Sequence, residues 1–204
     1  MNDSSLIVSQ PAAPAALVLL FHGVGSSPAD LVPLAELVAR QRPDALVVSV
    51  SAAHPSSFGT GRQWFSVAGI TEENRPARIA QAMPAFESAV AQWQAQAGVG
   101  PAGTTLIGFS QGAIMSLEAT QVADLAARVI GLSGRFAQAP RRAPAGVVFR
   151  FIHGQVDPVI DPRFSAEAAQ ALRALGADAT AQILPGLAHG IDERVARLVL
   201  EALG

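Results

Sequence analysis

The sequence predicts an α/β domain with a mostly parallel central sheet and helices on both faces of that sheet. Two observations lead to this prediction. Short apolar runs alternate with longer segments of helical periodicity, as in repeated strand–helix units. Most of the apolar runs are continuous, which is typical of strands covered on both faces. One domain spanning 1–204 is expected, without a separate lid domain, because no insertion is long enough to form one.

Seven apolar runs are expected to form strands, the first of them at an edge of the sheet. The run PAALVLLF (14–21) has roughly 8 residues, whereas a membrane-spanning helix needs about 20. No basic segment precedes it, so it is not expected to be a leader, and we expect a cytoplasmic protein without stable membrane insertion. The predicted strands are 5–9, 17–21, 45–50, 104–109, 128–132, 147–152 and 179–184.

Five helices are expected between and after these strands. The first begins with Ser27 as N-cap and Pro28 at the first helical position, and it runs to about residue 41. The longest, near 73–97, carries apolar residues at alternating steps of four and three, and Gly98 ends it. The remaining predicted helices are 111–120, 164–175 and 191–203.

Two stretches, 51–63 and 133–146, have no regular pattern, and loops of this length in a compact domain are often functional. We expect them to shape a pocket. The second loop carries three arginines, which are interpreted as part of a solvated surface rather than as contacts to an anionic substrate: Arg135, Arg141 and Arg142.

Composition excludes several kinds of chemistry. The formal net charge is −2, so no excess of positive charge is available to attract nucleic acid, and no such partner is expected. All 14 basic residues are arginine, which rules out a Schiff base, a P-loop lysine and a Ser–Lys dyad. The absence of cysteine rules out a thiolate nucleophile and a cysteine-ligated metal.

A serine stands between two glycines, in Gly108-Phe-Ser110-Gln-Gly112, where strand 104–109 gives way to helix 111–120. A tight turn would explain the glycines, but so would a nucleophile elbow. In an elbow the serine takes positive φ, and the residues two before and two after it must be small because strand and helix approach closely. Ser133 also follows a predicted strand, but no helix begins behind it, so we interpret it as a turn.

A serine nucleophile needs a base and an acid, which follow it in the order serine, acid, histidine in this strand–turn–helix arrangement. Asp157 lies in the loop after strand 147–152, and His189 lies between the last strand and the last helix. His153, just inside a strand end, is interpreted as a packed structural residue. Two competing acids are assigned to helix starts: Asp161 as an N-cap, and Asp192 in the first turn of the last helix.

Acyl-transfer chemistry also needs amide donors for the developing oxyanion. We assign one to the N–H of Gln111, directly after the serine, and the other to the N–H of Val24 in the glycine-containing loop LLFHGVGSSP (19–28). A phosphate-binding loop is the alternative, but the chain has neither lysine nor the G-x-G-x-x-G pattern. The side chain of His22 is expected to brace this loop.

Five segments of the sequence resemble the small α/β-hydrolases of the phospholipase/carboxylesterase family, in particular its bacterial YpfH-type esterases. They are FHGVGSSP, GRQWFSVAGITEENR, LIGFSQGAIM, HGQVDPVI and LAHGID. The resemblance covers about residues 6–203, and the family also includes the acyl-protein thioesterases.

This resemblance implies an enzyme with the α/β-hydrolase fold and no cap domain. It also implies that the enzyme hydrolyses esters or thioesters and uses neither a metal nor a cofactor. By position it implies Ser110 as nucleophile, His189 as base and Asp157 as the residue that orients the base. It likewise implies oxyanion amides from Val24 and Gln111. It also places the pair Trp64-Phe65 near the active site, with Trp64 in the acyl pocket. The loop HGVGSSP lacks the leucine and acidic residue typical of the thioesterases, which argues against protein depalmitoylation.

The expected function is therefore that of a serine carboxylesterase that acts on a small-molecule ester or thioester, as a monomer or homodimer. Two alternatives stay open. One is an acyl thioesterase or acyltransferase with the same triad, and the other is a non-catalytic binding protein on a hydrolase scaffold.

Overall fold

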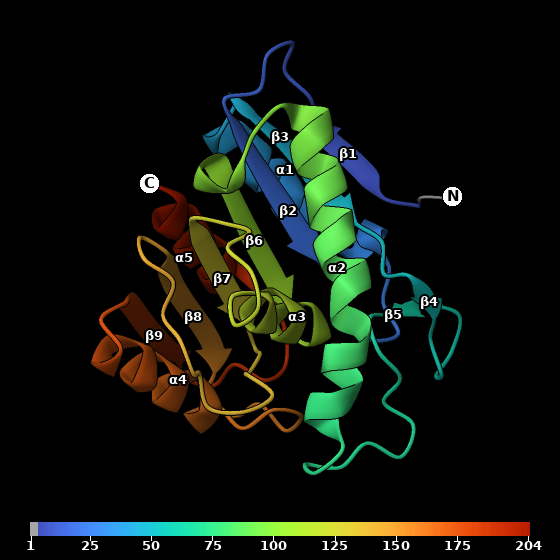
Figure 1. The fold of residues 1–204 in the computed structure, drawn as a ribbon, viewed down its shortest axis with the longest axis vertical. Helices are drawn as coiled ribbons and strands as arrows, with labels where there is room; N and C mark the ends of the chain where they lie inside the picture. Colours follow the sequence, from blue (N-terminus) through green and yellow to red (C-terminus); the bar gives the residue numbers. More distant parts are fainter. Residues whose placement is uncertain (1–3) are drawn as a thin grey trace.

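The computed structural model describes residues 4–204, and these residues contain a seven-stranded sheet in the order β1-β3-β2-β6-β7-β8-β9 (Figure 1). Within the described residues β1 is the strand that runs antiparallel to its neighbour, and the other six are parallel. The strands are β1 Leu6–Ser9, β2 Ala16–Phe21, β3 Ala45–Val50, β6 Thr104–Phe109, β7 Arg128–Leu132, β8 Val148–Gly154 and β9 Asp178–Leu184. The predicted mostly parallel sheet is confirmed.

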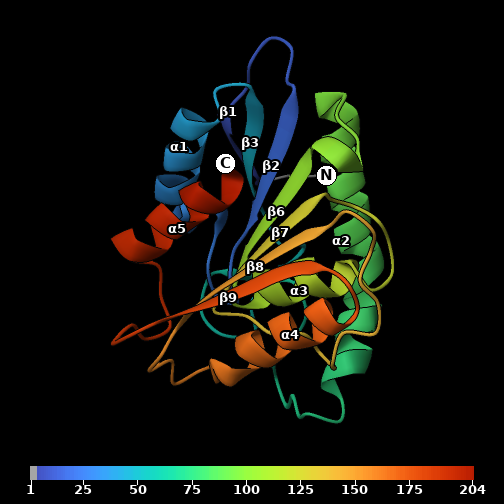
Figure 2. The same ribbon diagram turned by 90° about the vertical axis from the view of Figure 1, so that its left-hand side faces the viewer.

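Helices cover both faces of the sheet (Figure 2). On one face lie α1 and α5, and on the other lie α2, α3 and α4, each layer sealed by its own cluster of buried apolar side chains. The helices are α1 Val32–Gln41, α2 Arg75–Ala97, α3 Gln111–Ala119, α4 Arg163–Ala174 and α5 Glu193–Leu203. The α/β-hydrolase fold predicted from the sequence is confirmed by this arrangement.

The longest helix, α2, buries the face that its sequence pattern predicts. Its buried side chains are those of Ile79, Met83, Phe86, Val90, Trp93 and Ala97. Their spacing of three and four residues places them on one stripe of a 3.6-residue helix, which packs against the sheet. Gly98 ends the helix with φ of 66°, a left-handed conformation that glycine adopts without strain.

Three local expectations need correction. The stretch 51–63 is not wholly irregular, because β4 (His54–Pro55) and β5 (Arg62–Gln63) form a small antiparallel ribbon. The first helix begins as a 3₁₀ turn, Pro28–Leu31, since the carboxylate of Asp30 accepts the N–H of Ser27 and holds the chain in a tight turn.

The last helix begins at Glu193, two residues after the predicted start at residue 191. Asp192 is the N-cap of α5 rather than part of its first turn, and its Oδ1 accepts the N–H groups of Arg194 and Val195 at 3.0 Å each. A carboxylate in this position satisfies amides that the helix itself leaves without acceptors.

Parallel strands place the loops that follow them at one edge of the sheet. The loops after β2, β6, β8 and β9 all leave from the end toward which the arrows in Figure 1 point, in the lower half of the view. The candidate residues from four distant parts of the chain are therefore brought to one edge. In residues 4–204 no helix is both long and apolar enough to cross a membrane.

Candidate active site

Ser110 stands at the sharp turn between β6 and α3, with φ of 53° and ψ of −113°. Positive φ is strained for a residue with a side chain, so the surrounding structure must impose it. It does so through backbone hydrogen bonds on both sides of the turn: the N–H of Ser110 donates to the carbonyl of Leu132 on β7 at 2.9 Å, and its own carbonyl accepts the N–H of Ile114 at 3.1 Å.

The two glycines that flank the serine are required by the close approach of strand and helix. A Cβ on Gly108 would lie 2.4 Å from the carbonyl of Gly112, and a Cβ on Gly112 would lie 2.1 Å from the carbonyl oxygen of Phe21 on β2. Both distances are far inside van der Waals contact. The turn thus meets the steric demand that the sequence motif predicts for a nucleophile elbow.

The three residues proposed from the sequence as a triad come together at this turn. The hydroxyl oxygen of Ser110 lies 3.0 Å from Nε2 of His189, and Nδ1 of His189 lies 2.6 Å from Oδ2 of Asp157. Ser110 and Asp157 are buried, whereas the His189 side chain is 16% exposed. The arrangement is a continuous hydrogen-bond chain from a carboxylate to a hydroxyl.

Asp157 is held by four donors. Its Oδ1 accepts the N–H groups of Val159 at 2.8 Å and Ile160 at 3.0 Å, while its Oδ2 faces both His189 and, at 3.1 Å, Nε2 of His153. Burial alone would raise the pKa of Asp157. The hydrogen bonds from His189 and from the two amides outweigh burial and hold the pKa below its usual value, so the carboxylate is ionised at neutral pH.

His153 is a member of this group that the sequence did not reveal. It is fully buried at the end of β8, as interpreted, but it is also in contact with the carboxylate of Asp157. Its Nε2 lies 2.9 Å from the carbonyl oxygen of Ile160 and its Nδ1 lies 2.7 Å from the hydroxyl of Ser165.

Because both neighbours of Nε2 are acceptors, the ring proton belongs on that nitrogen, and Nδ1 accepts from Ser165. Burial lowers the pKa of His153, which keeps it in this neutral form. The signal in the sequence was the four-residue spacing from His153 to Asp157 through Gly154, where the chain turns back on itself.

Val24 and Gln111, the expected oxyanion donors, both line the cavity beside Ser110. Gln111 is the first residue of α3, so its N–H is among those that a helix leaves without an internal acceptor. The loop that carries Val24 is braced by His22, as expected. Nδ1 of His22 lies 2.7 Å from the carbonyl of Gly23, and its Nε2 accepts the N–H of Ala52 at 3.2 Å.

The side chain of Gln111 also binds the backbone of the Trp64-Phe65 segment, a contact that the sequence did not predict. It is buried, its Oε1 accepts the N–H of Trp64 at 2.7 Å, and its Nε2 donates to the carbonyl of Phe65 at 2.7 Å. The residue after the nucleophile therefore fastens the Trp64-Phe65 segment to the elbow.

A cavity of about 740 Å³ opens beside Ser110. Phe65 lines it, together with apolar side chains of Val67, Ile70, Ile114, Val159, Ile160 and Phe164. Trp64 is not among the described residues that line it, contrary to the expectation that it forms part of an acyl pocket. The ring of Trp64 packs against those of Phe21 and Phe86, with centroid distances of 5.4 Å in each case. Its Nε1–H donates a hydrogen bond to the carbonyl of His22 at 2.9 Å, which orients the ring toward the core.

Two further expectations change at the wall of this cavity. Asp161 lies one residue before the N-cap of α4, which is Pro162, but its carboxylate still caps the helix start: Oδ1 of Asp161 accepts the N–H of Arg163, the first residue of α4, at 2.9 Å. Arg135 is not solvated, since its side chain is only 11% exposed and lies over the ring of Phe164, at 3.8 Å from the ring centroid.

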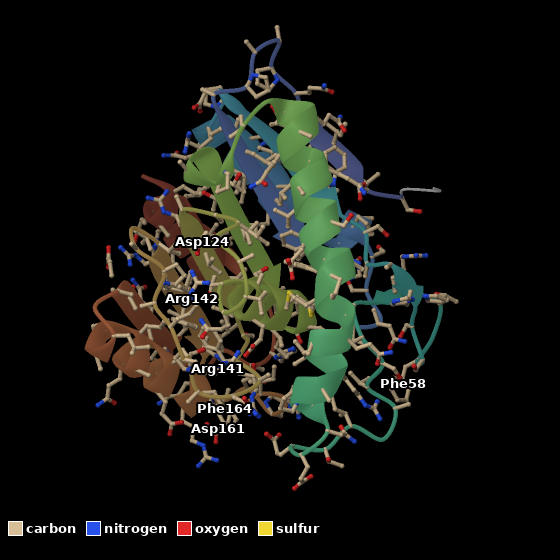
Figure 3. The ribbon with its side chains drawn as sticks, in the orientation of Figure 1. Phe58, Asp124, Arg141, Arg142, Asp161 and Phe164 are labelled. Atoms are coloured by element: carbon tan, nitrogen blue, oxygen red, sulfur yellow. The ribbon has the colours of Figure 1, made fainter. Side chains whose placement is uncertain are left out.

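The other two arginines of the loop 133–146 do lie on the surface. The side chains of Arg141 and Arg142 are 50% and 40% exposed, and they pair with Glu118 and Asp124 respectively. Figure 3 labels them left of centre, above Phe164 and Asp161. Within residues 4–204 no cluster of His, Asp and Glu has the arrangement of a metal site.

Comparisons with known proteins find several relatives of this chain. A family model described as Phospholipase/Carboxylesterase matches residues 2–203. The chain is 47% identical over 205 residues to the protein named Esterase YpfH of Escherichia coli (strain K12), covering 100% of this chain and 88% of that protein.

Two solved structures illustrate the likeness in three dimensions. The crystal structure of esterase PE8 superposes with a TM-score of 0.88 at 31% identity, covering 98% of this chain and 96% of that one. The Zea mays acyl-protein thioesterase 2 gives a TM-score of 0.75 at 19% identity, with 98% and 96% covered, a likeness that shows the fold alone.

Proposed function

The chain belongs to the phospholipase/carboxylesterase family, and we propose that it is a serine carboxylesterase that cleaves small or acyl-chain carboxylic esters through an acyl-serine intermediate. The observation that carries this proposal is the hydrogen-bond chain Asp157–His189–Ser110, with heavy-atom distances of 2.6 and 3.0 Å, at the wall of the 740 Å³ cavity.

In the proposed first half-reaction, the oxygen of Ser110 attacks the ester carbonyl carbon while Nε2 of His189 takes the serine proton. The carbonyl oxygen becomes an oxyanion, which the N–H groups of Val24 and Gln111 stabilise. Loss of one such donor costs on the order of 10²–10³ in rate. Collapse of this intermediate breaks the ester bond, and His189 gives its proton to the leaving alcohol.

In the second half-reaction, His189 takes a proton from water, whose oxygen attacks the acyl-Ser110 carbonyl. The bond between the acyl carbon and the Ser110 oxygen then breaks, His189 returns the proton to that oxygen, and the carboxylic acid is released. Asp157 stabilises the imidazolium in both steps and orients the ring. We assign His153 as a positioning residue, because its Nε2–H is a second donor to the same oxygen of Asp157 that faces His189. No step needs a metal or a cofactor.

Intact mass after reaction with a fluorophosphonate probe tests the nucleophile. We expect one adduct on the wild-type protein and none on Ser110→Ala. Ser133→Ala is a matched control, since Ser133 is also a buried serine with positive φ at a strand end, and it should still form the adduct. A wild-type protein without adduct would overturn the proposal and favour a non-catalytic binding protein. A Ser110→Ala variant that still forms the adduct would overturn Ser110 as the nucleophile.

A chain-length series of 4-nitrophenyl esters and matched thioesters then separates the proposed carboxylesterase from a thioesterase with the same triad. A carboxylesterase should turn over the oxoesters at least as well as the thioesters. An added alcohol would reveal acyl transfer as a transesterified product. The cytoplasmic location and the monomeric or dimeric state remain predictions.

A further inference from the structure

The cavity beside Ser110 has an excess of positive charge at one part of its wall. Six charged side chains line it: Glu72, Arg75, Arg135, Asp157, Asp161 and Arg163. Asp157 is engaged by His189, and Asp161 pairs with Arg163 at 3.2 Å. The remaining three are two guanidinium groups and a single carboxylate.

That carboxylate, of Glu72, is shared between the two arginines. Nη1 and Nη2 of Arg135 donate to its two oxygens at 3.1 and 2.9 Å, and Nη2 of Arg75 donates to Oε1 at 2.9 Å. The hydrogen bond from Arg135 lowers the pKa of Glu72, so the group is ionised at neutral pH. One negative charge still leaves the group with a net charge of about +1.

The two cations are built into the wall, whereas the carboxylate is not. The side chains of Arg75 and Arg135 are 18% and 11% exposed, compared with 60% for Glu72. Arg135 is further fixed by its Nε–H, which donates to the carbonyl of Phe136 at 3.0 Å, and by the ring of Phe164 beneath it. Because the Glu72 side chain lies mostly in solvent, its carboxylate can move away when a ligand carboxylate takes over its hydrogen bonds to the two arginines.

Arg75 also has unused donor capacity. Its Nε is buried and has no hydrogen-bond partner among the described residues. A buried donor without an acceptor is unfavourable, so Glu72 does not satisfy the whole guanidinium group of Arg75.

The position of Glu72 shows which ligand chemistry fits. Its carboxylate meets the fork of Arg135 in the two-pronged geometry that guanidinium groups prefer, while most of the remaining cavity wall is apolar. We propose that Arg75 and Arg135 form an anion subsite of the substrate cavity, and that the preferred ester carries a carboxylate which takes the place of that of Glu72.

This inference rests on the proposed function, since it concerns the same cavity. The carboxylate could belong to the acyl part or to the alcohol part of the ester, and two substrate pairs distinguish these sources. The acyl pair is mono-4-nitrophenyl adipate with 4-nitrophenyl hexanoate, and the alcohol pair is 4-carboxyphenyl hexanoate with phenyl hexanoate. In each pair the ratio of kcat/KM, anionic over neutral, is compared between variants, which cancels the intrinsic reactivity of the two esters.

We expect the ratio of at least one pair to fall about 10- to 100-fold in Arg135→Gln and in Arg75→Gln, as for the loss of a hydrogen bond to a charged group. Glu72→Gln should change it in the opposite direction, mainly through a lower KM for the anionic ester, because the competing carboxylate is removed. Arg141→Gln, on the same loop as Arg135 but outside the cavity wall, should leave both ratios unchanged.

The pair that responds identifies the part of the substrate that carries the charge. Turnover of the neutral esters with ratios that are equal in wild type, Arg75→Gln and Glu72→Gln would overturn the subsite while leaving the esterase proposal intact. Absence of turnover of all four esters by the wild-type protein would overturn the proposed function, and the subsite with it.

Discussion

Asp157 is the residue on which the geometry of the site converges. One oxygen is anchored by two backbone amides, and the other receives both His189 and His153. If Oδ2 of Asp157 had only His189 as a donor, the carboxylate could still rotate. The second donor, His153, restricts that rotation. Side chains behind a catalytic group often matter in this way, because a displacement of about 1 Å at the reacting atoms can cost 10²-fold in rate.

Two substitutions of His153 separate its positioning role from its packing role. Glutamine places an amide N–H near the position of Nε2 and can still donate to Asp157, whereas asparagine reaches only the position of Nδ1, beside Ser165. For His153→Asn we expect kcat for ester hydrolysis to fall on the order of 10-fold with KM little changed. His153→Gln should recover most of this loss.

Steady-state kinetics of both variants, with urea unfolding as a measure of stability, checks this prediction. Equal losses of kcat in the two variants that follow their losses of stability would show that His153 only fills space.

At the scale of elements, the elbow depends on how closely α3 approaches β2 and β6. All nine residues of α3 are buried, so the helix has no free side toward which it could move. Because α3 is packed on every face, it cannot shift to relieve the strained backbone conformation of Ser110. Gly112 is the point of closest approach, directly against the carbonyl of Phe21.

Gly112→Ala should consequently be severe. With a Cβ placed 2.1 Å from a backbone oxygen, we expect the free energy of unfolding to fall by about 3 kcal/mol or more, with loss of esterase activity. Gly100→Ala is the control, since Gly100 has ordinary backbone angles and no atom within 4 Å of the added Cβ. It should change stability by less than about 0.5 kcal/mol. Similar unfolding midpoints for the two variants would contradict the steric account of the elbow.

At the scale of the whole molecule, a mostly parallel sheet between two helical layers brings distant residues to a single edge, as with Ser110 and His189, which are 79 positions apart in the sequence. Making that core also buries polar groups. His22, directly after β2, and His153, on β8, are both fully buried, and each has partners that require a neutral ring.

This burial makes the stability of the fold depend on pH. Burial lowers the pKa of both histidines below the ordinary 6.5, so as the pH falls through 6.5 the unfolded chain binds protons that the folded chain does not. The free energy of unfolding should therefore decrease below about pH 6.5, by at most about 1.4 kcal/mol per pH unit for each histidine.

The decrease should steepen near pH 4, because the folded structure also lowers the pKa of Asp157 below 3.8 and loses this contribution on protonation. Urea midpoints between pH 8 and pH 4 measure the effect, and His153→Gln should reduce the slope between pH 6.5 and pH 5. A midpoint that stays constant from pH 7 to pH 5 would show that the buried histidines do not titrate as inferred.

The sequence by itself determined the seven strands of the main sheet, the buried stripe of α2 and the elbow at Ser110, because each depends on residues close together in the chain. It also predicted which side chains would meet at the carboxyl edge, since residues that follow parallel strands share that edge whatever their separation in sequence. The number of domains, expected to be one, remains a prediction from length and pattern.

Only the tertiary structure decided how side chains point once they reach that edge. His153 turns toward Asp157, Trp64 turns into the core, and Arg135 meets Glu72 across 63 residues of sequence. The contact of His153 has only the four-residue spacing to Asp157 as a signal, and the other two contacts have none, because a buried histidine, an aromatic pair or a loop arginine is compatible with either orientation. Side-chain direction is set by the hydrogen-bond partners and the free volume that the assembled fold provides, and these come from segments far apart in the chain.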